Sequence, residues 1–273
     1  MTEPRRDRWG RYIIPDPKTG EDREWTRATT IAGVLPDRYH LERWGERMVV
    51  LGIARDESLY VLAQTSKYED KQQLDRIARD AKSAAKSGSA ANVGTAIHKF
   101  TEMVEDGYSI DVVPQRYRAD VAAYLDALKQ LDATVLSKEQ IVLNPAVGVA
   151  GTYDRKLAIP RFSKSPIIGD IKTGRTVDFG LLEFSVQLAI YANSEYRFDV
   201  DTGEVEDIGG KDTPDREVGL LFHIQAGKGR CEVWELDLVR GWEAAKVALQ
   251  VREMRSWKDL GKKIEITQPE EEE

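Results

Sequence analysis

The feature that most constrains the fold is a change of sequence pattern after Asp132. Before this residue, apolar side chains recur at helical spacing over long stretches. After it come three short β-branched runs between turn residues: TVLSKEQIVLN (134–144), VGVAGTYDRKLAI (147–159) and PIIGDIK (166–172). Such runs are typical of β-strands. The chain is therefore expected to build a sheet in its second half, behind a helical first half.

The first half is expected to contain a hairpin and four or more helices. The hairpin covers 11–25, where two half-apolar runs flank a Pro/Asp/Gly cluster. A helix starts at Thr29–Thr30, and an amphipathic helix follows over 41–56 with Leu41, Trp44, Met48 and Leu51 on one face. Three further helices are predicted over 70–86, 90–106 and 114–132.

The second half continues with a helix over 178–198, two strands over 217–225 and 230–238, and a closing amphipathic helix over 240–260. We therefore expect an α/β fold with a mixed sheet flanked by helices. The expected division is an N-terminal hairpin and helices (1–86), a core that carries most of the sheet (87–262) and a disordered acidic tail (263–273).

Composition excludes several classes of protein. No apolar run approaches the roughly 20 residues that a membrane span needs, and the charged N-terminus does not resemble a secretory signal. The single cysteine, Cys231, allows neither an internal disulfide nor a cysteine-ligated zinc or iron–sulfur cluster. These features predict a cytoplasmic protein without a membrane partner.

Net charge does not decide the partner. The formal charge is -7, which alone argues mildly against nucleic acid. However, the stretches QPEEEE and VDTGEVED each carry four acids and are expected to be solvated and mobile. The folded body is then close to neutral, and a DNA partner stays open.

The third β-branched run ends with an acid and a base two residues apart, Asp170 and Lys172. Side chains at this spacing on a strand project from the same face. Two buried charges are costly unless they are paired or belong to a site. The pattern therefore predicts a functional site or, as the plainer alternative, a surface ion pair at the sheet edge.

The preceding run delivers a second acid, Asp154, after a stretch punctuated by glycine. Two adjacent strands that each supply an aspartate bring together carboxylates that repel unless a cation or proton lies between them. An oxygen-rich site of this kind suits Mg²⁺ or Mn²⁺. The alternative is that Asp154 is a turn residue or an ion-pair partner of Arg155 or Lys156.

Two helices add polar residues at helical spacing. Gly94, His98 and Glu102 lie along one face, where glycine permits close packing and imidazole can bind a metal. Gln187 and Tyr191 lie four apart on the helix after the Asp-x-Lys strand. The alternatives are a structural histidine and the polar rim of a core helix.

The order of these four motifs resembles the PD-(D/E)XK nuclease superfamily, and within it the RecB-type branch that includes phage exonucleases. The resemblance runs from about Gly94 to Tyr191, and the segment REWTRATTIAGVLPDRYHLERW (23–44) is similar to the opening of phage-encoded members. It implies a restriction-endonuclease-like core. Many relatives hold an iron–sulfur cluster with four cysteines, which this chain lacks.

Carried over by position, the resemblance implies a set of site residues. His98, Asp154, Asp170 and the main-chain carbonyl of Ile171 would bind Mg²⁺ or Mn²⁺, with Asp154 and Asp170 also counted as catalytic. Lys172 would be the catalytic lysine, and Gln187 with Tyr191 the substrate-binding pair. Glu102 and Glu139 rank lower, as auxiliary acids.

The implied function is a metal-dependent DNA exonuclease in phage recombination, repair or end resection, partnered with a recombinase or annealing protein. The alternatives are a structure-selective or single-strand endonuclease and an inactive nuclease fold that binds DNA or protein. Oligomeric state stays open. A cationic stripe of Arg76, Arg79, Lys82 and Lys86 could follow a DNA backbone, or it is an ordinary solvated helix face.

Overall fold

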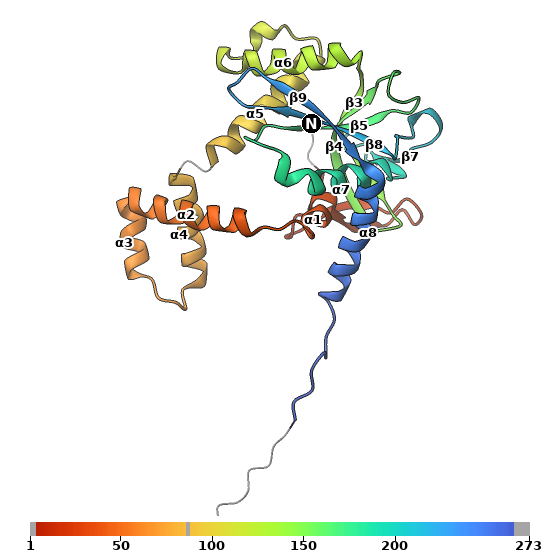
Figure 1. The fold of residues 1–273 in the computed structure, drawn as a ribbon. Coiled ribbons are helices and arrows are strands. Elements are labelled where there is room, and N and C mark those ends of the chain that lie inside the picture. The colour runs from red at the N-terminus through yellow and green to blue at the C-terminus, as the bar shows by residue number, and fades with distance from the viewer. Residues whose placement is uncertain (1–3, 86–87, 265–273) are drawn as a thin grey trace, which may run out of the picture.

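The computed structural model describes residues 4–85 and 88–264, and within them nine strands form one mixed sheet (Figure 1). The strands are β1 (Tyr12–Pro15), β2 (Asp22–Arg27), β3 (Thr134–Asn144), β4 (Val149–Ala158), β5 (Ile167–Lys172), β6 (Tyr196–Phe198), β7 (Val205–Asp207), β8 (Val218–Ile224) and β9 (Cys231–Asp237). Their order is β7-β6-β3-β4-β5-β8-β9, with β2 also paired to β4 and β1 to β2. The predicted α/β architecture with a mixed sheet is confirmed.

Helices cover both faces of the sheet (Figure 1). They are α1 (Ala28–Ala32), α2 (Tyr39–Arg55), α3 (Glu57–Thr65), α4 (Lys71–Ala84), α5 (Gly88–Glu105), α6 (Gln115–Leu131), α7 (Leu181–Ala192) and α8 (Leu238–Met254), with short 3-10 turns at Ile110–Val112, Asp178–Gly180 and Gly210–Asp212. One apolar core joins α5 and α6 to the sheet, and a second joins α1, α7 and α8 to its other face.

Strand β4 has two different partners along one edge. Its last residues pair with β5, in a ladder that ends at Arg155 opposite Gly169, and its first two pair with β2. Between these ladders, residues 151–154 have no partner on that edge among the described strands. The resulting gap separates β4 from the end of β5, and Asp154 lies in it.

Helices α2, α3 and α4 form an arm beside the sheet (Figure 1). The helix over 41–56 was predicted correctly, but its apolar face is not its packing face. Leu41, Trp44 and Leu51 are exposed, whereas Gly45 and Gly52 are buried. A Cβ on Gly52 would lie 1.8 Å from the Ala81 carbonyl oxygen, so the missing side chain lets α2 and α4 touch backbone to backbone.

Other predicted elements need adjustment. The helix predicted over 178–198 ends at Ala192, and Tyr196–Phe198 is instead a short strand paired with β3. Part of the segment predicted to be mobile, Val205–Asp207, is a strand paired with β6. Helix α3 was not predicted. Of these elements, β6 depends on a partner far along the chain, β3, which a local pattern does not reveal.

The predicted hairpin, and the strands over 134–144 and 166–172, are confirmed almost residue for residue. The hairpin joins the sheet through β2, and Trp25 is fully buried. The domain division at residue 86 stays a prediction, and most of the predicted acidic tail lies outside the described residues. No helix in the described part of the chain is long and apolar enough to cross a membrane.

Candidate functional site

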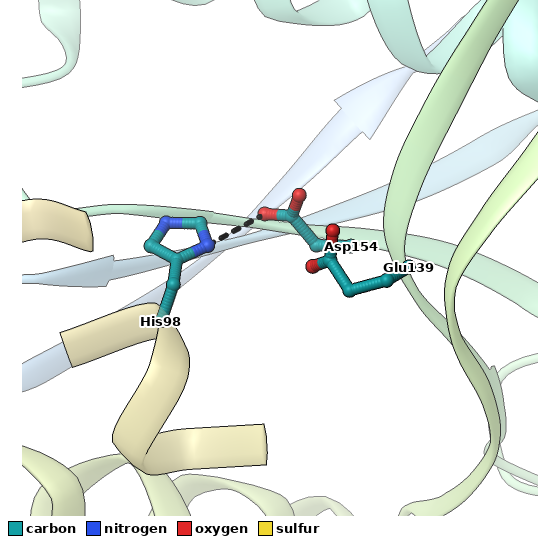
Figure 2. A group of neighbouring side chains, drawn as sticks. All are labelled: His98, Glu139 and Asp154. Atoms are coloured by element: carbon teal, nitrogen blue, oxygen red, sulfur yellow. Dashed lines mark ion pairs between the residues drawn. The ribbon is translucent and has the colours of Figure 1, made fainter. Parts of the chain in front are cut away.

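Three side chains from different elements converge beside the gap in the sheet (Figure 2). His98 comes from α5, Glu139 from β3 and Asp154 from β4. Each offers one ligand atom, and these atoms all lie within 4.8 Å of one another. His98 Nδ1 lies 3.6 Å from Asp154 Oδ2. We call these three residues the outer half of the site.

Local backbone geometry explains why Glu139 joins this group. The β3–β4 register places Lys138 opposite Arg155 and Gln140 opposite Tyr153, so Glu139 falls opposite Asp154. Residues in this relation project to the same side of a sheet. Glu139 also has φ 48°, in the left-handed region that side chains seldom adopt, and such strain is found most often at functional sites.

Helix α5 approaches closely enough to bring His98 to the strands because residue 94 is glycine. A Cβ there would lie 2.6 Å from Thr173 Oγ1, on the loop that follows Lys172. The predicted packing role of Gly94 is therefore confirmed. Ile97, its neighbour on the helix, is fully buried in the core and fixes the rotation of α5.

Asp154 is tied to the end of β5 across the gap. Its Oδ2 accepts a hydrogen bond from the Ile171 N–H at 2.7 Å, where a continued ladder would have placed a backbone carbonyl. Because a strand residue's N–H and C=O point to the same side, the Ile171 carbonyl faces the outer half. Its role as a metal ligand stays a prediction.

The inner half of the site is Asp170, Lys172, Gln187 and Tyr191. Asp170 Oδ2 lies 2.5 Å from Lys172 Nζ, and its Oδ1 accepts a hydrogen bond from Gln187 Nε2 at 3.3 Å. Gln187 also donates to the Tyr191 hydroxyl at 3.1 Å. The Asp170 side chain is 3% exposed, in a strand between β4 and β8. The alternative of a surface ion pair at the sheet edge is therefore wrong.

The position of Gln187 and Tyr191 follows from Gly151. A Cβ on Gly151 would lie 2.5 Å from the Tyr191 ring, so glycine lets α7 lie against β4. Both polar side chains are buried and turned toward Asp170. They are not the polar rim of a core helix. A small pocket of about 170 Å³, lined also by Arg6, Tyr12 and Arg27, reaches them.

Burial and mutual repulsion raise the pKa values of the acids. Burial, then the charges of Asp154 and Glu102, raise the pKa of Glu139 to about 7. Burial and the charge of Asp154 raise the pKa of Asp170 to about 6, and burial also raises the pKa of Asp154. The site therefore concentrates carboxyl groups that resist ionisation together unless a cation joins them.

The pKa values of the two basic groups are shifted in opposite directions. Burial lowers the pKa of His98, which favours the neutral imidazole that binds metals. Burial alone would also lower the pKa of Lys172, but the adjacent Asp170 and Asp154 carboxylates outweigh it and raise the pKa. Lys172 is therefore held as a cation, and His98 is favoured as a neutral imidazole.

A buried arginine beneath the outer half was missed by the sequence analysis. Arg155 is fully buried and donates to Glu105 Oε1 at 2.8 Å, Thr101 Oγ1 at 3.0 Å and the Asp154 carbonyl at 2.7 Å. It also lies 3.5 Å from Glu139 Oε1. The Asp154 carboxylate is therefore not the ion-pair partner of Arg155, and Lys156 pairs with Asp212. Strand alternation indicates that Arg155 is internal, but not what it meets.

The outer half opens to solvent. An open pocket of about 430 Å³ is lined by Gly94, Thr95, His98, Lys99, Glu102, Glu139 and Thr173. Lys99, Glu102 and Glu139 also line a second pocket of about 640 Å³, so the two pockets adjoin. Glu102 lies in the wall and pairs with Lys99 at 3.4 Å. Among the predicted auxiliary acids, the structure brings Glu139, rather than Glu102, into the cluster with His98 and Asp154.

The predicted cationic stripe lies on α4, in the arm. Arg76, Arg79 and Lys82 are exposed there, and Lys86 lies outside the described residues. Asp75 and Asp80 are interleaved with them on the same helix. The two interpretations of this stripe stay open.

Comparisons with known proteins add little. Neither a protein-family model nor a curated protein matches this sequence. Among solved structures, the crystal structure of SSO0001 is similar over 59% of this chain and 75% of its own, with 13% identity and a TM-score of 0.25. That likeness is too slight to carry an argument, so function has to be argued from the site.

Proposed function

We propose that this protein is a metal-dependent DNA nuclease of the PD-(D/E)XK type, in the RecB-type branch, acting as an exonuclease. The observation that carries the proposal is the convergence of His98, Glu139 and Asp154 on an open pocket, next to the buried Asp170–Lys172 pair. Metal-assisted phosphodiester hydrolysis needs a cluster of acids that can bind a cation and a fixed positive charge to stabilise the transition state.

The residues present fit a hard divalent cation. The outer half offers two carboxylates and a neutral imidazole, donors suited to Mn²⁺ and, for the oxygens, Mg²⁺. Asp170 is already compensated by the Lys172 ammonium at 2.5 Å and by the Gln187 amide. Glu139 and Asp154 lie next to it, and three carboxyl groups gathered in this way support a cation at this place. His98, Glu139 and Asp154 would hold it, with Asp170 and the Ile171 carbonyl beside them.

A bound divalent cation supplies a Lewis acid that polarises the phosphoryl oxygen and makes a water nucleophilic at neutral pH. Lys172 stabilises the negative charge that develops on the phosphate oxygens, and its ion pair with Asp170 fixes its position. Gln187 orients Asp170 and is itself oriented by Tyr191. Arg155 steadies the backbone at Asp154.

The same observations support a restriction-endonuclease-like core as the finer description of the fold. In this proposal, the early end of the β4–β5 ladder is functional, since it frees Asp154 and the Ile171 backbone to face the pocket. The flanking helices α5 and α7 then supply His98 on one side and Gln187 on the other.

The test is an incubation of end-labelled linear duplex, nicked circular and closed circular DNA with the protein in Mg²⁺, in Mn²⁺ and in EDTA. We expect metal-dependent loss of the linear substrate, with closed circles left intact. Cleavage of closed circles would show an endonuclease. Binding without cleavage of any substrate would show an inactive nuclease fold, and would overturn the proposal.

A further inference from the structure

Three aromatic side chains cluster on the surface between the arm and the sheet. Tyr39 and His40 begin α2, and Phe179 lies in the 3-10 turn before α7. The rings of Tyr39 and His40 meet edge to face at 5.4 Å between centroids, and those of His40 and Phe179 at 6.4 Å. Phe179 is 87% exposed and Tyr39 59% exposed. Large aromatic rings left this open usually mark an interaction surface.

A chain of contacts links this cluster to the catalytic lysine. Residue 180 is glycine, and a Cβ there would lie 2.4 Å from the Phe184 ring, so the turn that carries Phe179 rests on that ring. Lys172 Nζ lies 5.1 Å from the centroid of the same ring. The aromatic cluster is therefore mounted directly beside the inner half of the site.

The charges near the cluster favour a polyanion. Arg38 precedes Tyr39, and Arg175 lies on the loop between Lys172 and Phe179. Both are exposed, and neither forms an ion pair with any residue that the structure describes. Two acids also lie nearby and keep their charge. Asp37 accepts the Tyr39 N–H at 2.8 Å, Asp178 accepts the Thr176 hydroxyl at 2.6 Å, and neither is paired with Arg38 or Arg175 among the described residues.

We propose that Tyr39, His40 and Phe179 form a stacking platform for the unpaired bases of a DNA strand, with Arg38 and Arg175 contacting its phosphates. The platform deepens the proposed nuclease function and rests on it. Exposed rings next to unpaired cations are the combination that binds single strands, because every base has a face that can stack and every linkage carries a charge. In a duplex, those base faces are covered by neighbouring base pairs, so the platform selects unpaired nucleotides.

The platform would also position single-stranded ends relative to Lys172. Bases stacked on Phe179 would hold the attached backbone close to Lys172, since only the Phe184 ring and one turn separate them. Aromatic and arginine side chains are also enriched at protein interfaces, so a protein partner is the competing occupant, and absence of oligo(dT) binding would point to it. The position of the rings beside Lys172 favours unpaired nucleotides.

The experiment measures binding of fluorescent oligo(dT) and of a blunt duplex of equal length, in EDTA so that nothing is cut. The variants are Phe179→Ala, Phe179→Trp and Tyr68→Ala, the last being an equally open aromatic (83% exposed) in the arm outside the cluster. We expect Phe179→Ala to weaken oligo(dT) binding by about 5- to 100-fold, with a smaller effect on the duplex. Phe179→Trp should bind as tightly as wild type, and Tyr68→Ala should be unchanged.

Equal oligo(dT) affinity of Phe179→Ala and wild type, or no oligo(dT) binding by the wild type, would overturn the platform. A parallel cleavage assay of duplex DNA in Mn²⁺ separates this result from the proposed function. If the wild type cleaves DNA and Phe179→Ala binds oligo(dT) as tightly as the wild type, the platform is refuted and the nuclease function stands. If Phe179→Ala loses oligo(dT) binding and the wild type does not cleave DNA, the platform stands and the nuclease function is refuted.

Discussion

The two halves of the candidate site differ in how the negative charges of their carboxyl groups are compensated. In the inner half, Asp170 is almost fully buried, but it has the Lys172 ammonium and the Gln187 amide as partners. In the outer half, Glu139 and Asp154 are partly exposed and face each other and His98. The inner half has an ammonium in direct contact with Asp170, whereas Arg155 approaches the outer half to 3.5 Å, at Glu139.

This difference shows which carboxyl groups of the site have a close cationic partner and which do not. Arg155 lies beneath the outer half, but its short contacts go to Glu105, Thr101 and a backbone carbonyl, and its distance to Glu139 is 3.5 Å. The outer carboxyl groups therefore keep raised pKa values. Arg155 compensates the outer carboxyl groups only in part, and carboxyl groups gathered in this way are suited to receive a cation.

The largest effect should come from removing the cation of the inner half. Lys172→Ala should slow DNA cleavage by about 10²- to 10³-fold, the usual consequence of losing one group that stabilises transition-state charge. Mn²⁺ binding, measured by calorimetry, should remain, because the outer half is intact. Lys164→Ala, an exposed lysine in the β4–β5 loop, is the matched control and should cut normally. Wild-type cleavage by Lys172→Ala would remove its assigned role.

The second largest effect should show which acids of the outer half bind the cation. Glu139→Gln should lower Mn²⁺ affinity by about 10- to 100-fold, in the range seen when groups that support a metal are altered. Glu102→Gln should change it only a few-fold, because Glu102 lies in the pocket wall and pairs with Lys99. Titration calorimetry on both variants checks this. The opposite ranking would show that the cation lies nearer to α5 than we infer.

The dependence of stability on pH distinguishes Glu139 from its surroundings. Its pKa is raised from 4.5 to about 7, so the stabilisation it gives is present below pH 4.5 and is lost as pH rises through 7. Gln mimics the protonated acid. Without metal, wild type and Glu139→Gln should therefore unfold at similar temperatures at pH 5, and wild type should be the less stable at pH 8.

Added Mn²⁺ should reverse that order at pH 8, because the ionised glutamate binds the cation and glutamine binds it poorly. Thermal unfolding of both proteins at pH 5 and pH 8, with and without Mn²⁺, gives all the values needed. Parallel unfolding temperatures for the two proteins at both pH values would mean that Glu139 titrates normally and is not part of a strained cluster.

The smallest effect tests how the outer half is held to the inner one. Gly94→Ala should gain about 1 kcal/mol of helix propensity and lose a similar amount through the contact of the new methyl with Thr173 Oγ1. Net stability should change little, but cleavage should slow a few-fold as α5 and His98 move. Adding Thr173→Ala should restore the rate. A double variant as slow as Gly94→Ala would show that this contact does not position His98.

Much of the fold was readable because the pattern is local. Strands β3 and β5 were bounded correctly by their β-branched composition, and α5 and α6 by their periodicity and end signals. The misassigned end of the helix over 178–198 depends on tertiary pairing. The residues of β6 look like a continuation of α7, and pairing with β3 and β7 makes them a strand.

The candidate site shows the same limit. Spacing placed Asp170 and Lys172 on one face and His98 on a helix, and the structure keeps them near one another. Spacing could not reveal that Gln187 and Tyr191 turn inward, since this depends on the glycine at position 151 of another element. It also ranked Glu139 low, because its direction depends on a left-handed backbone and on the register with β4.

The most direct test of the account is cleavage of labelled DNA as a function of Mn²⁺ concentration, for wild type and Asp154→Asn, alongside direct Mn²⁺ binding. Asp154 belongs to the cation cluster and is tied to Ile171, so it connects the outer half to the catalytic strand. We predict that wild-type cleavage saturates at the Mn²⁺ concentration that saturates binding, and that Asp154→Asn neither binds at that concentration nor cuts. Cleavage by the wild type in EDTA, or equal binding and cleavage by Asp154→Asn, would contradict the account.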